Sequence, residues 1–214
     1  MELPLEKRLK RRLHAEVGML QDEVAEAAYA IDSELVLHGG TAIWRCFSGN
    51  RFSEDLDFYC RKPGKIEEEL AGVLQSRALV LSKFKRTENL IFAKITNGQA
   101  EVRLEMNLSA KVKAEARRYE RINGSSMDVL CPPADALLAE KAAAYHNRRF
   151  VRDLYDVYHL SGIVAESRVA QDAVRKMLKE FEPPVDEANL PALIYSGAVP
   201  SVQQMVLVLK RRWL

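Results

Sequence analysis

One stretch, residues 38–58, constrains the fold of this chain more than any other. An apolar run at residues 35–37 is typical of a short strand, and Gly39 and Gly40 follow it directly. Thr41 is expected to cap a short helix that starts there. A helix N-terminus presents free backbone N–H groups and a partial positive charge, and glycines let a phosphate approach that backbone closely. We therefore expect a phosphate-binding turn at Gly39, Gly40 and Thr41.

Two aspartates follow in the same stretch, Asp55 and Asp57, on either side of Leu56 in a second expected strand. Side chains two residues apart on a strand point to the same face, so the two carboxylates lie together. A strand with only a structural role gains nothing from like charges side by side. Two carboxylates in this position can hold Mg²⁺ between them and the phosphates of a nucleotide. We therefore expect Asp55 and Asp57 to be metal ligands and catalytic residues.

The rest of the chain divides into a mixed half and a helical half. Apolar residues spaced three and four apart predict one long helix over residues 5–30. A helix is also expected over 65–76, and strands over 78–84, 89–96, 101–108, 117–122 and 126–130. After two prolines, Pro132 and Pro133, the sequence favours helices over 134–146, 150–161 and 166–181. The expected fold is α/β (α+β): a small, mixed, twisted sheet with flanking helices in residues 1–131, followed by a helical half in residues 132–214 that completes the active-site cleft.

The glycine and aspartate motifs together resemble those of a known superfamily, the DNA polymerase β-like nucleotidyltransferases. More narrowly, residues 39–58 (GGTAIWRCFSGNRFSEDLDF) resemble the AbiEii/AbiGii-type toxin nucleotidyltransferases. That family carries an Arg-x-Ser-Glu-Asp-Leu-Asp string, and the matching residues here are Arg51, Ser53, Glu54, Asp55, Leu56 and Asp57. The resemblance implies transfer of a nucleoside monophosphate from a nucleoside triphosphate to an acceptor hydroxyl, with release of pyrophosphate. Ser53 is then expected to help hold the phosphates.

Many members of the superfamily use a third carboxylate on a later strand. In residues 101–108 apolar and polar residues alternate, as in a half-buried strand, and Glu105 lies on the polar face. Glu105 is the best candidate for the third metal ligand and for the general base of the attacking hydroxyl. The alternative is a solvated charge beside Arg103.

A second group of residues lies in the helical half, within residues 140–160. It resembles the family's C-terminal pattern, and the matching residues are Lys141, Ala144, Arg148, Arg152, Asp153 and Asp156. Helical spacing puts four residues on one side: Lys141, Tyr145, Arg148 and Arg152. The cations among them can clamp a triphosphate and neutralise charge that develops in phosphoryl transfer. The resemblance implies that Lys141 and Asp156 lie in the active site, with Lys141 on the phosphates. Arg148 is expected to brace the triphosphate beside Lys141. Asp153 is expected to pair with Arg149 as a structural bridge.

Composition limits the class of protein. The net charge is only +2, so the chain is not a polycation that binds nucleic acid by bulk charge. Three widely spaced cysteines fit a reducing compartment. The absence of a signal-peptide pattern and of a long apolar run predicts a cytoplasmic protein with no membrane partner.

Two short basic segments, residues 7–12 and 210–212, are the places where a polyanion is expected to bind; the alternative is that they are solvated helix faces. In the first, Leu5, Leu9 and Leu13 are expected to pack inward and to leave Lys10 and Arg11 facing outward.

The chain is therefore expected to be a nucleotidyltransferase that uses Mg²⁺, with two ions, and a nucleoside triphosphate. RNA, including tRNA, is the expected acceptor. The family resemblance suggests the toxin of a toxin–antitoxin or phage-defence system, with a cognate antitoxin as protein partner. Two alternatives stay open: a nucleotide-binding module without turnover, and a nucleotidyltransferase that acts on a small molecule or a protein.

Overall fold

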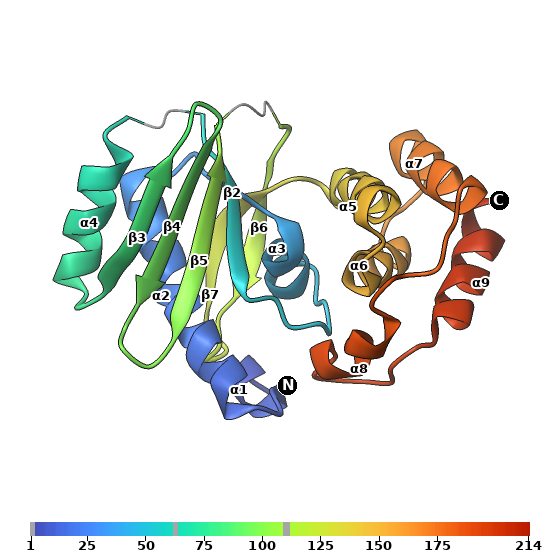
Figure 1. The fold of residues 1–214 in the computed structure, drawn as a ribbon, viewed down its shortest axis with the longest axis horizontal. Helices are drawn as coiled ribbons and strands as arrows, with labels where there is room; N and C mark the ends of the chain where they lie inside the picture. The colour runs from blue at the N-terminus through green and yellow to red at the C-terminus, as the bar shows by residue number, and fades with distance from the viewer. Residues whose placement is uncertain (1–2, 62–63, 109–111) are drawn as a thin grey trace. The chain divides into compact units, whose positions relative to one another are not determined.

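The computed structural model describes residues 3–61, 64–108 and 112–214 and divides into two compact units. The first unit comprises Met1–Cys46 and Ser53–Pro132, and the second comprises Phe47–Phe52 and Pro133–Leu214 (Figure 1). The first is a mixed α/β unit, and the second is largely helical. The expected fold class is confirmed.

Strands of the first unit form one mixed sheet. Within the described residues it has seven strands in the order β3-β4-β5-β2-β1-β7-β6 (Figure 1). Two neighbouring pairs, β2 with β5 and β1 with β7, are parallel, and the other neighbours are antiparallel. The bounds are β1 Val36–His38, β2 Asp55–Tyr59, β3 Val80–Arg86, β4 Leu90–Thr96, β5 Glu101–Asn107, β6 Glu115–Glu120 and β7 Ser126–Cys131.

Helices of the first unit leave the side chains on the polar side of β2 partly exposed. The bounds are α1 Leu5–Arg8, α2 Arg12–Ile31, α3 Gly39–Cys46 and α4 Ile66–Ser76. Helix α2 packs on β2 and β5, and α4 packs on α2 and β3. Leu56 and Phe58 of β2 are fully buried, whereas Asp55 and Asp57 alternate with them and stay partly exposed. This alternation, which the sequence predicted, separates a core face from a polar face.

The N-terminal segment differs from the single long helix predicted over residues 5–30. Helix α1 ends at Arg8, Leu9 is extended, and α2 begins at Arg12. The Glu6 N–H donates to the Ile122 carbonyl at 3.0 Å, and Arg8 pairs with Glu120, so contacts with β6 and the turn after it hold α1 apart from α2. Leu13 is 58% exposed, so the expectation that it packs inward is wrong.

The second unit combines C-terminal helices with a short segment from the first half of the sequence. The helices are α5 Ala134–Arg148, α6 Val151–Ser161, α7 Arg168–Lys179, α8 Leu190–Leu193 and α9 Val202–Trp213. The Phe52 N–H donates to the Leu193 carbonyl at 2.9 Å, and the Tyr195 N–H donates to the Asn50 carbonyl at 3.1 Å. Residues 47–52 therefore belong to this unit, although they lie far from it in the sequence. None of the helices in the described ranges is long and apolar enough to cross a membrane.

A buried arginine joins α2, α3 and β6 in the first unit. Arg45 of α3 is 2% exposed, and it donates to the carbonyls of Gly18 and Glu120, each at 3.1 Å. Its Nη2 lies 3.3 Å from Asp22 Oδ1, and its guanidinium lies 3.9 Å above the Trp44 ring. A guanidinium that satisfies several buried acceptors at once fixes the position of α3, the helix that begins with the two glycines.

We expect Arg45→Met to lower the free energy of unfolding by about 3 kcal/mol, because it leaves Asp22 and two carbonyls with fewer partners in a buried setting. The matched control is Arg12→Met, since the Arg12 side chain is 91% exposed and pairs with Glu16 at i,i+4; we expect it to cost less than about 0.5 kcal/mol. Urea denaturation followed by circular dichroism measures both. Equal losses in the two variants would show that Arg45 does not fix α3.

Candidate active site

The parallel pairing of β2 with β5 gathers the predicted carboxylates of the first unit on one face. Asp57 is the register partner of Glu105, and Asp55 is the register partner of Arg103. Because register partners and residues two apart share a face, Asp55, Asp57 and Glu105 all project from the polar face of the sheet. The structure thus brings together the three side chains that the sequence placed on two separate strands.

The backbone at Gly39 approaches Asp57 closely. Gly39 is the first residue of α3 and has a φ of +73°, which glycine adopts without strain. A Cβ at this position would lie 2.3 Å from Asp57 Oδ2, which is inside any allowed contact distance. Gly39 is therefore required both for the turn from β1 into α3 and for the position of the Asp57 carboxylate. Gly40 follows it as the second residue of the helix and is buried.

Thr41 lies inside α3, so the expectation that it caps the helix is wrong. Helix α3 begins two residues earlier, at Gly39. The Thr41 hydroxyl is fully buried and donates to the backbone carbonyl of Asp55 at 2.5 Å. Its side chain ties the first turn of α3 to the first residue of β2.

Two further contacts fix the backbone beside the carboxylates. Ser53 lies two residues before β2, and its carbonyl accepts a hydrogen bond from the Gln21 amide Nε2 at 2.8 Å. His38, the register partner of Asp57, stacks its ring on Tyr59 with the centroids 3.8 Å apart. The segment just before β2 is thereby attached to α2, and the end of β1 is attached to β2.

Arg103 is the cation that contacts the Asp55 and Glu105 carboxylates on this face. Its Nε donates to Asp55 Oδ1 at 3.0 Å, its Nη2 donates to Asp55 Oδ2, and its Nε lies 3.6 Å from Glu105 Oε1. The hydrogen bonds and the charge of Asp55 raise the pKa of the Arg103 guanidinium. Within the described residues no three acidic, histidine or cysteine side chains lie close enough together to hold one metal ion. The carboxylate donors that Mg²⁺ prefers are present on the face, but Asp55 gives both of its oxygens to Arg103.

The second unit contains its own charge network, built around Asp156. Arg51 donates from Nε and Nη2 to the two oxygens of Asp156, each at 2.8 Å, and both side chains are buried. Lys141 Nζ lies 3.3 Å from Asp156 Oδ2 and 3.6 Å from Asp153 Oδ1. Burial alone would raise the pKa of the Asp156 carboxyl, but Arg51 and Lys141 together hold that pKa below its ordinary value. The network therefore stays charged at neutral pH.

Asp153 pairs with a different arginine from the one expected. Arg148 donates to its two oxygens at 2.7 and 2.8 Å, and Arg149 pairs with Glu182 instead. The reason is local: α5 ends at Arg148, and Arg149 adopts the left-handed conformation with a φ of +53°. Because Arg149 and Asp153 do not share one continuous helix, their i,i+4 spacing does not bring them together.

The sequence did not predict that Arg51 belongs to this charge network. It identified Arg51 only as a residue that matches the family string. Its partner Asp156 lies 105 residues away. No local spacing relates the two, so only the fold reveals the pair.

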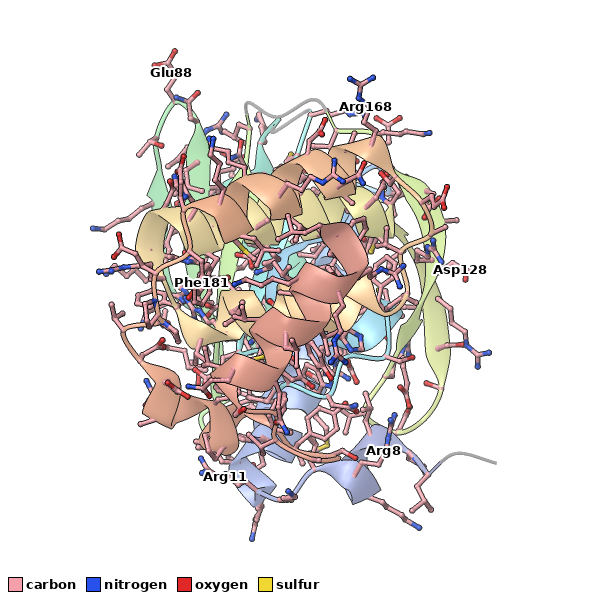
Figure 2. The ribbon with its side chains drawn as sticks, turned by 90° about the vertical axis from the view of Figure 1, so that its right-hand side faces the viewer. Arg8, Arg11, Glu88, Asp128, Arg168 and Phe181 are labelled. Carbon is pink, nitrogen blue, oxygen red and sulfur yellow. The ribbon has the colours of Figure 1, made fainter. Side chains whose placement is uncertain are left out.

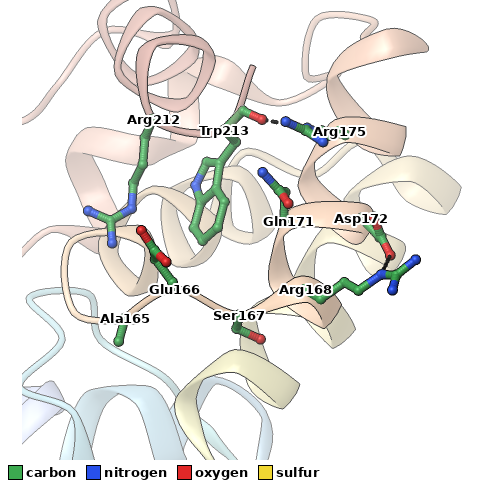
Figure 3. Close-up of a pocket in the computed structure, with 9 residues that line it drawn as sticks. All are labelled: Ala165, Glu166, Ser167, Arg168, Gln171, Asp172, Arg175, Arg212 and Trp213. Carbon is green, nitrogen blue, oxygen red and sulfur yellow. Dashed lines mark hydrogen bonds and ion pairs between the residues drawn. The ribbon is translucent and has the colours of Figure 1, made fainter.

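A pocket of about 840 Å³ lies in the second unit, near the start of α7 and the end of α9 (Figure 3). Its arginines all have protein partners: Arg168 pairs with Asp172, Arg175 donates to the Trp213 carbonyl, and Arg212 donates to the Val164 carbonyl. The residues predicted for the catalytic, metal and nucleotide sites are all described by the structure, and none of them lines this pocket, whereas Arg212 of the basic segment 210–212 does. We assign it no role in the site.

Comparisons with known proteins connect this geometry to a family. The family model described as "Nucleotidyl transferase AbiEii toxin, Type IV TA system" matches residues 25–193. A comparison with curated proteins gave no match.

Solved structures share the fold at low sequence identity. A protein from H. pylori that is assigned as a nucleotidyltransferase is 20% identical, with a TM-score of 0.66 over 94% of this chain and 93% of that chain. JHP933 from Helicobacter pylori is 20% identical, with a TM-score of 0.62 over 94% of this chain and 90% of that chain. MenT4, a nucleotidyltransferase toxin from Mycobacterium tuberculosis, is 18% identical, with a TM-score of 0.61 over 94% of this chain and 82% of that chain.

We expect Gly39→Ala to destabilise the first unit by more than strain alone, because the added methyl group meets the Asp57 carboxylate. Gly98→Ala is the matched control: its φ is +86°, but a Cβ there meets nothing within 4 Å. Strain in the left-handed region costs about 1–2 kcal/mol in each variant, and we expect a further loss of about 1–3 kcal/mol only for Gly39→Ala. Urea denaturation measures the difference. If the two variants lose the same free energy, Asp57 moves away freely and the close approach has no structural importance.

We expect Arg51→Met to lower the free energy of unfolding by about 3–5 kcal/mol, because it leaves a buried carboxylate with Lys141 as its remaining cation. Arg168→Met is the control, since the Arg168 side chain is 93% exposed.

The pH dependence provides a second measurement of the same pair. Since the folded state lowers the pKa of Asp156, its stabilising contribution is full above the ordinary carboxyl pKa of about 4 and is lost as the pH falls through the lowered value. Arg51→Met should therefore lose less stability on acidification than the unmodified protein. An unchanged acid dependence would contradict the assignment.

Proposed function

Because the family model matches most of the chain, the protein belongs to the AbiEii family of nucleotidyltransferase toxins, and we propose that it transfers a nucleoside monophosphate to a hydroxyl group of RNA with Mg²⁺ at the polar face of the sheet. It is a nucleotidyltransferase, and its family implies a nucleoside triphosphate substrate and an antitoxin partner. The metal, the RNA acceptor and the roles of single residues are the proposed part.

The observation that carries the proposal is the placement of Asp55, Asp57 and Glu105 on one face beside the Gly39 backbone. Carboxylate oxygens are the donors that Mg²⁺ takes in phosphate-transfer sites, so the donor set fits the metal once Asp55 is released by Arg103. Asp55, Asp57 and Glu105 would hold two Mg²⁺ ions. Such ions stabilise the attacking and the leaving oxygens of a phosphoryl transfer.

The remaining groups of the first unit have roles that follow from their positions. Backbone N–H groups at Gly39 and Gly40 lie in the first turn of α3, where the partial positive charge of the helix favours phosphate. Ser53 offers a hydroxyl just before β2, and Thr41 offers its backbone N–H because its hydroxyl binds the Asp55 carbonyl. Glu105 accepts the proton of the acceptor hydroxyl.

For Lys141 and Arg148 the support for a phosphate-binding role is the family pattern. Within the second unit both side chains are held by Asp153, and Lys141 also by Asp156. The two oxygens of Asp156 receive Arg51, so we assign Asp156 the role of a positioning residue that fixes Lys141.

An RNA acceptor is supported by exposed basic residues. Lys10, Arg11 and Arg12 are exposed at the N-terminal end, and Figure 2 shows Arg11 on the outer side of the N-terminal helices. A second exposed cluster, Lys210 to Arg212, ends α9. An RNA backbone uses several such phosphate contacts, whereas a small-molecule acceptor needs none.

The test is label transfer from each of the four α-³²P nucleoside triphosphates to total RNA with Mg²⁺. We expect Asp57→Asn to reduce transfer by about a thousandfold or more, because a neutral amide is a poor ligand for the metal that stabilises the reaction. The free energy of unfolding should not fall, since the change removes one of several crowded negative charges. Glu88→Gln, on the exposed loop between β3 and β4, is the charge-matched control and should transfer normally.

A folded Asp57→Asn protein that transfers at the normal rate would refute the proposed site. Nucleotide binding without transfer to RNA, to protein or to small acceptors would favour the binding module instead.

A further inference from the structure

Arg103 has an unusual position for a surface arginine. It lies on β5 directly opposite Asp55 and two residues before Glu105, so it stands among the carboxylates that the proposed function gives to the metal. Its contact with Asp55 is bidentate, and its Nε lies 3.6 Å from Glu105. Its side chain is 45% exposed, so it has open space into which it can move.

We propose that Arg103 is an exchangeable counter-ion, which holds Asp55 in the resting protein and moves to the phosphates of the nucleotide when the metal–nucleotide complex binds. The proposal rests on the proposed function, because it takes Asp55 and its neighbours as the metal ligands. Family membership alone does not give Arg103 this positioning role, nor does it say that Arg103 leaves Asp55 when the metal–nucleotide complex binds.

The charges on the face explain why a resident cation is needed. Asp55, Asp57 and Glu105 are crowded on two adjacent strands, and like charges at this spacing repel one another. A guanidinium that donates to both oxygens of Asp55 offsets this repulsion when no metal is bound. Its planar fork suits a carboxylate and a phosphate equally well, so it can exchange one for the other without a change in chemistry.

The same contact weakens the binding of a free divalent cation at this site. To bind Asp55, the cation has to break two hydrogen bonds and leave a guanidinium near a second positive charge. A nucleoside triphosphate removes this penalty, because its phosphates give Arg103 a new anionic partner. The metal and the nucleotide should therefore bind cooperatively, and the cooperativity should depend on Arg103.

The chain provides a matched control on the same sheet. Lys94 of β4 pairs with Glu101 of β5 at 2.5 Å, with side chains of similar exposure, but Glu101 belongs to no proposed ligand set. Loss of the Lys94 charge alone changes the net charge of the sheet surface by the same amount as loss of the Arg103 charge.

The experiment is a titration with Mn²⁺, followed by the electron paramagnetic resonance signal of the free ion, with and without each of the four α,β-methylene nucleoside triphosphates. We expect Arg103→Met to bind free Mn²⁺ about fivefold tighter than the unmodified protein, because a well-formed exposed ion pair no longer competes. By linkage, the factor by which a nucleotide analogue tightens Mn²⁺ binding should fall in the same variant. Lys94→Met should change neither quantity by more than about twofold.

Each outcome distinguishes the two proposals. If Asp57→Asn abolishes Mn²⁺ binding but Arg103→Met binds Mn²⁺ as the unmodified protein does, the metal site stands and the exchange is refuted. If Lys94→Met tightens binding as much as Arg103→Met, the effect is general surface charge and the exchange is also refuted. If Mn²⁺ does not bind even with a nucleotide analogue, or Asp57→Asn leaves binding unchanged, the proposed metal site fails and the exchange fails with it.

Discussion

The register between β2 and β5 is the constraint on which the rest of the first unit depends. In this register Leu56 and Phe58 lie in the core, and their neighbours Asp55 and Asp57 lie opposite Arg103 and Glu105. A shift of one residue would bury the carboxylates and expose the core residues, so the hydrophobic effect that stabilises the sheet also fixes the polar face. The arrangement of charges is thus a consequence of core packing.

Three carboxylates of this structure share one arrangement, an ion pair with an arginine. Each is matched by an arginine from a distant part of the chain: Asp22 by Arg45, Asp55 by Arg103, and Asp156 by Arg51. The pairs differ in burial. The Arg51 and Arg45 pairs are largely buried and structural, since a charge left behind there has little access to water. The pair at Asp55 is half exposed, and only such a pair can exchange partners at low cost.

Local sequence patterns predicted most helices and strands. Features that depend on long-range contacts were not predictable from those patterns. Alternation on β2 and β5 and the Gly-Gly turn are local, so the sequence placed these elements and their polar residues within a few positions of where they lie. The break between α1 and α2 depends on Glu120 and Ile122, more than a hundred residues further on. The pairing of Arg51 with Asp156 is also long-range. Helix α5 is terminated by Arg149 in the left-handed conformation, a position that glycine or asparagine usually occupies, so the sequence did not indicate this end.

The segment Phe47–Phe52 constrains when the second unit can fold during translation. Arg51 leaves the ribosome 105 residues before its partner Asp156. At roughly 5–20 residues per second, this amounts to a wait of about 5–20 s during translation. Through that interval the sheet can begin to form, but the six-residue segment between α3 and β2 has no helical unit to join. The second unit can therefore be completed only late in synthesis, and it then incorporates residues 47–52, which were translated much earlier.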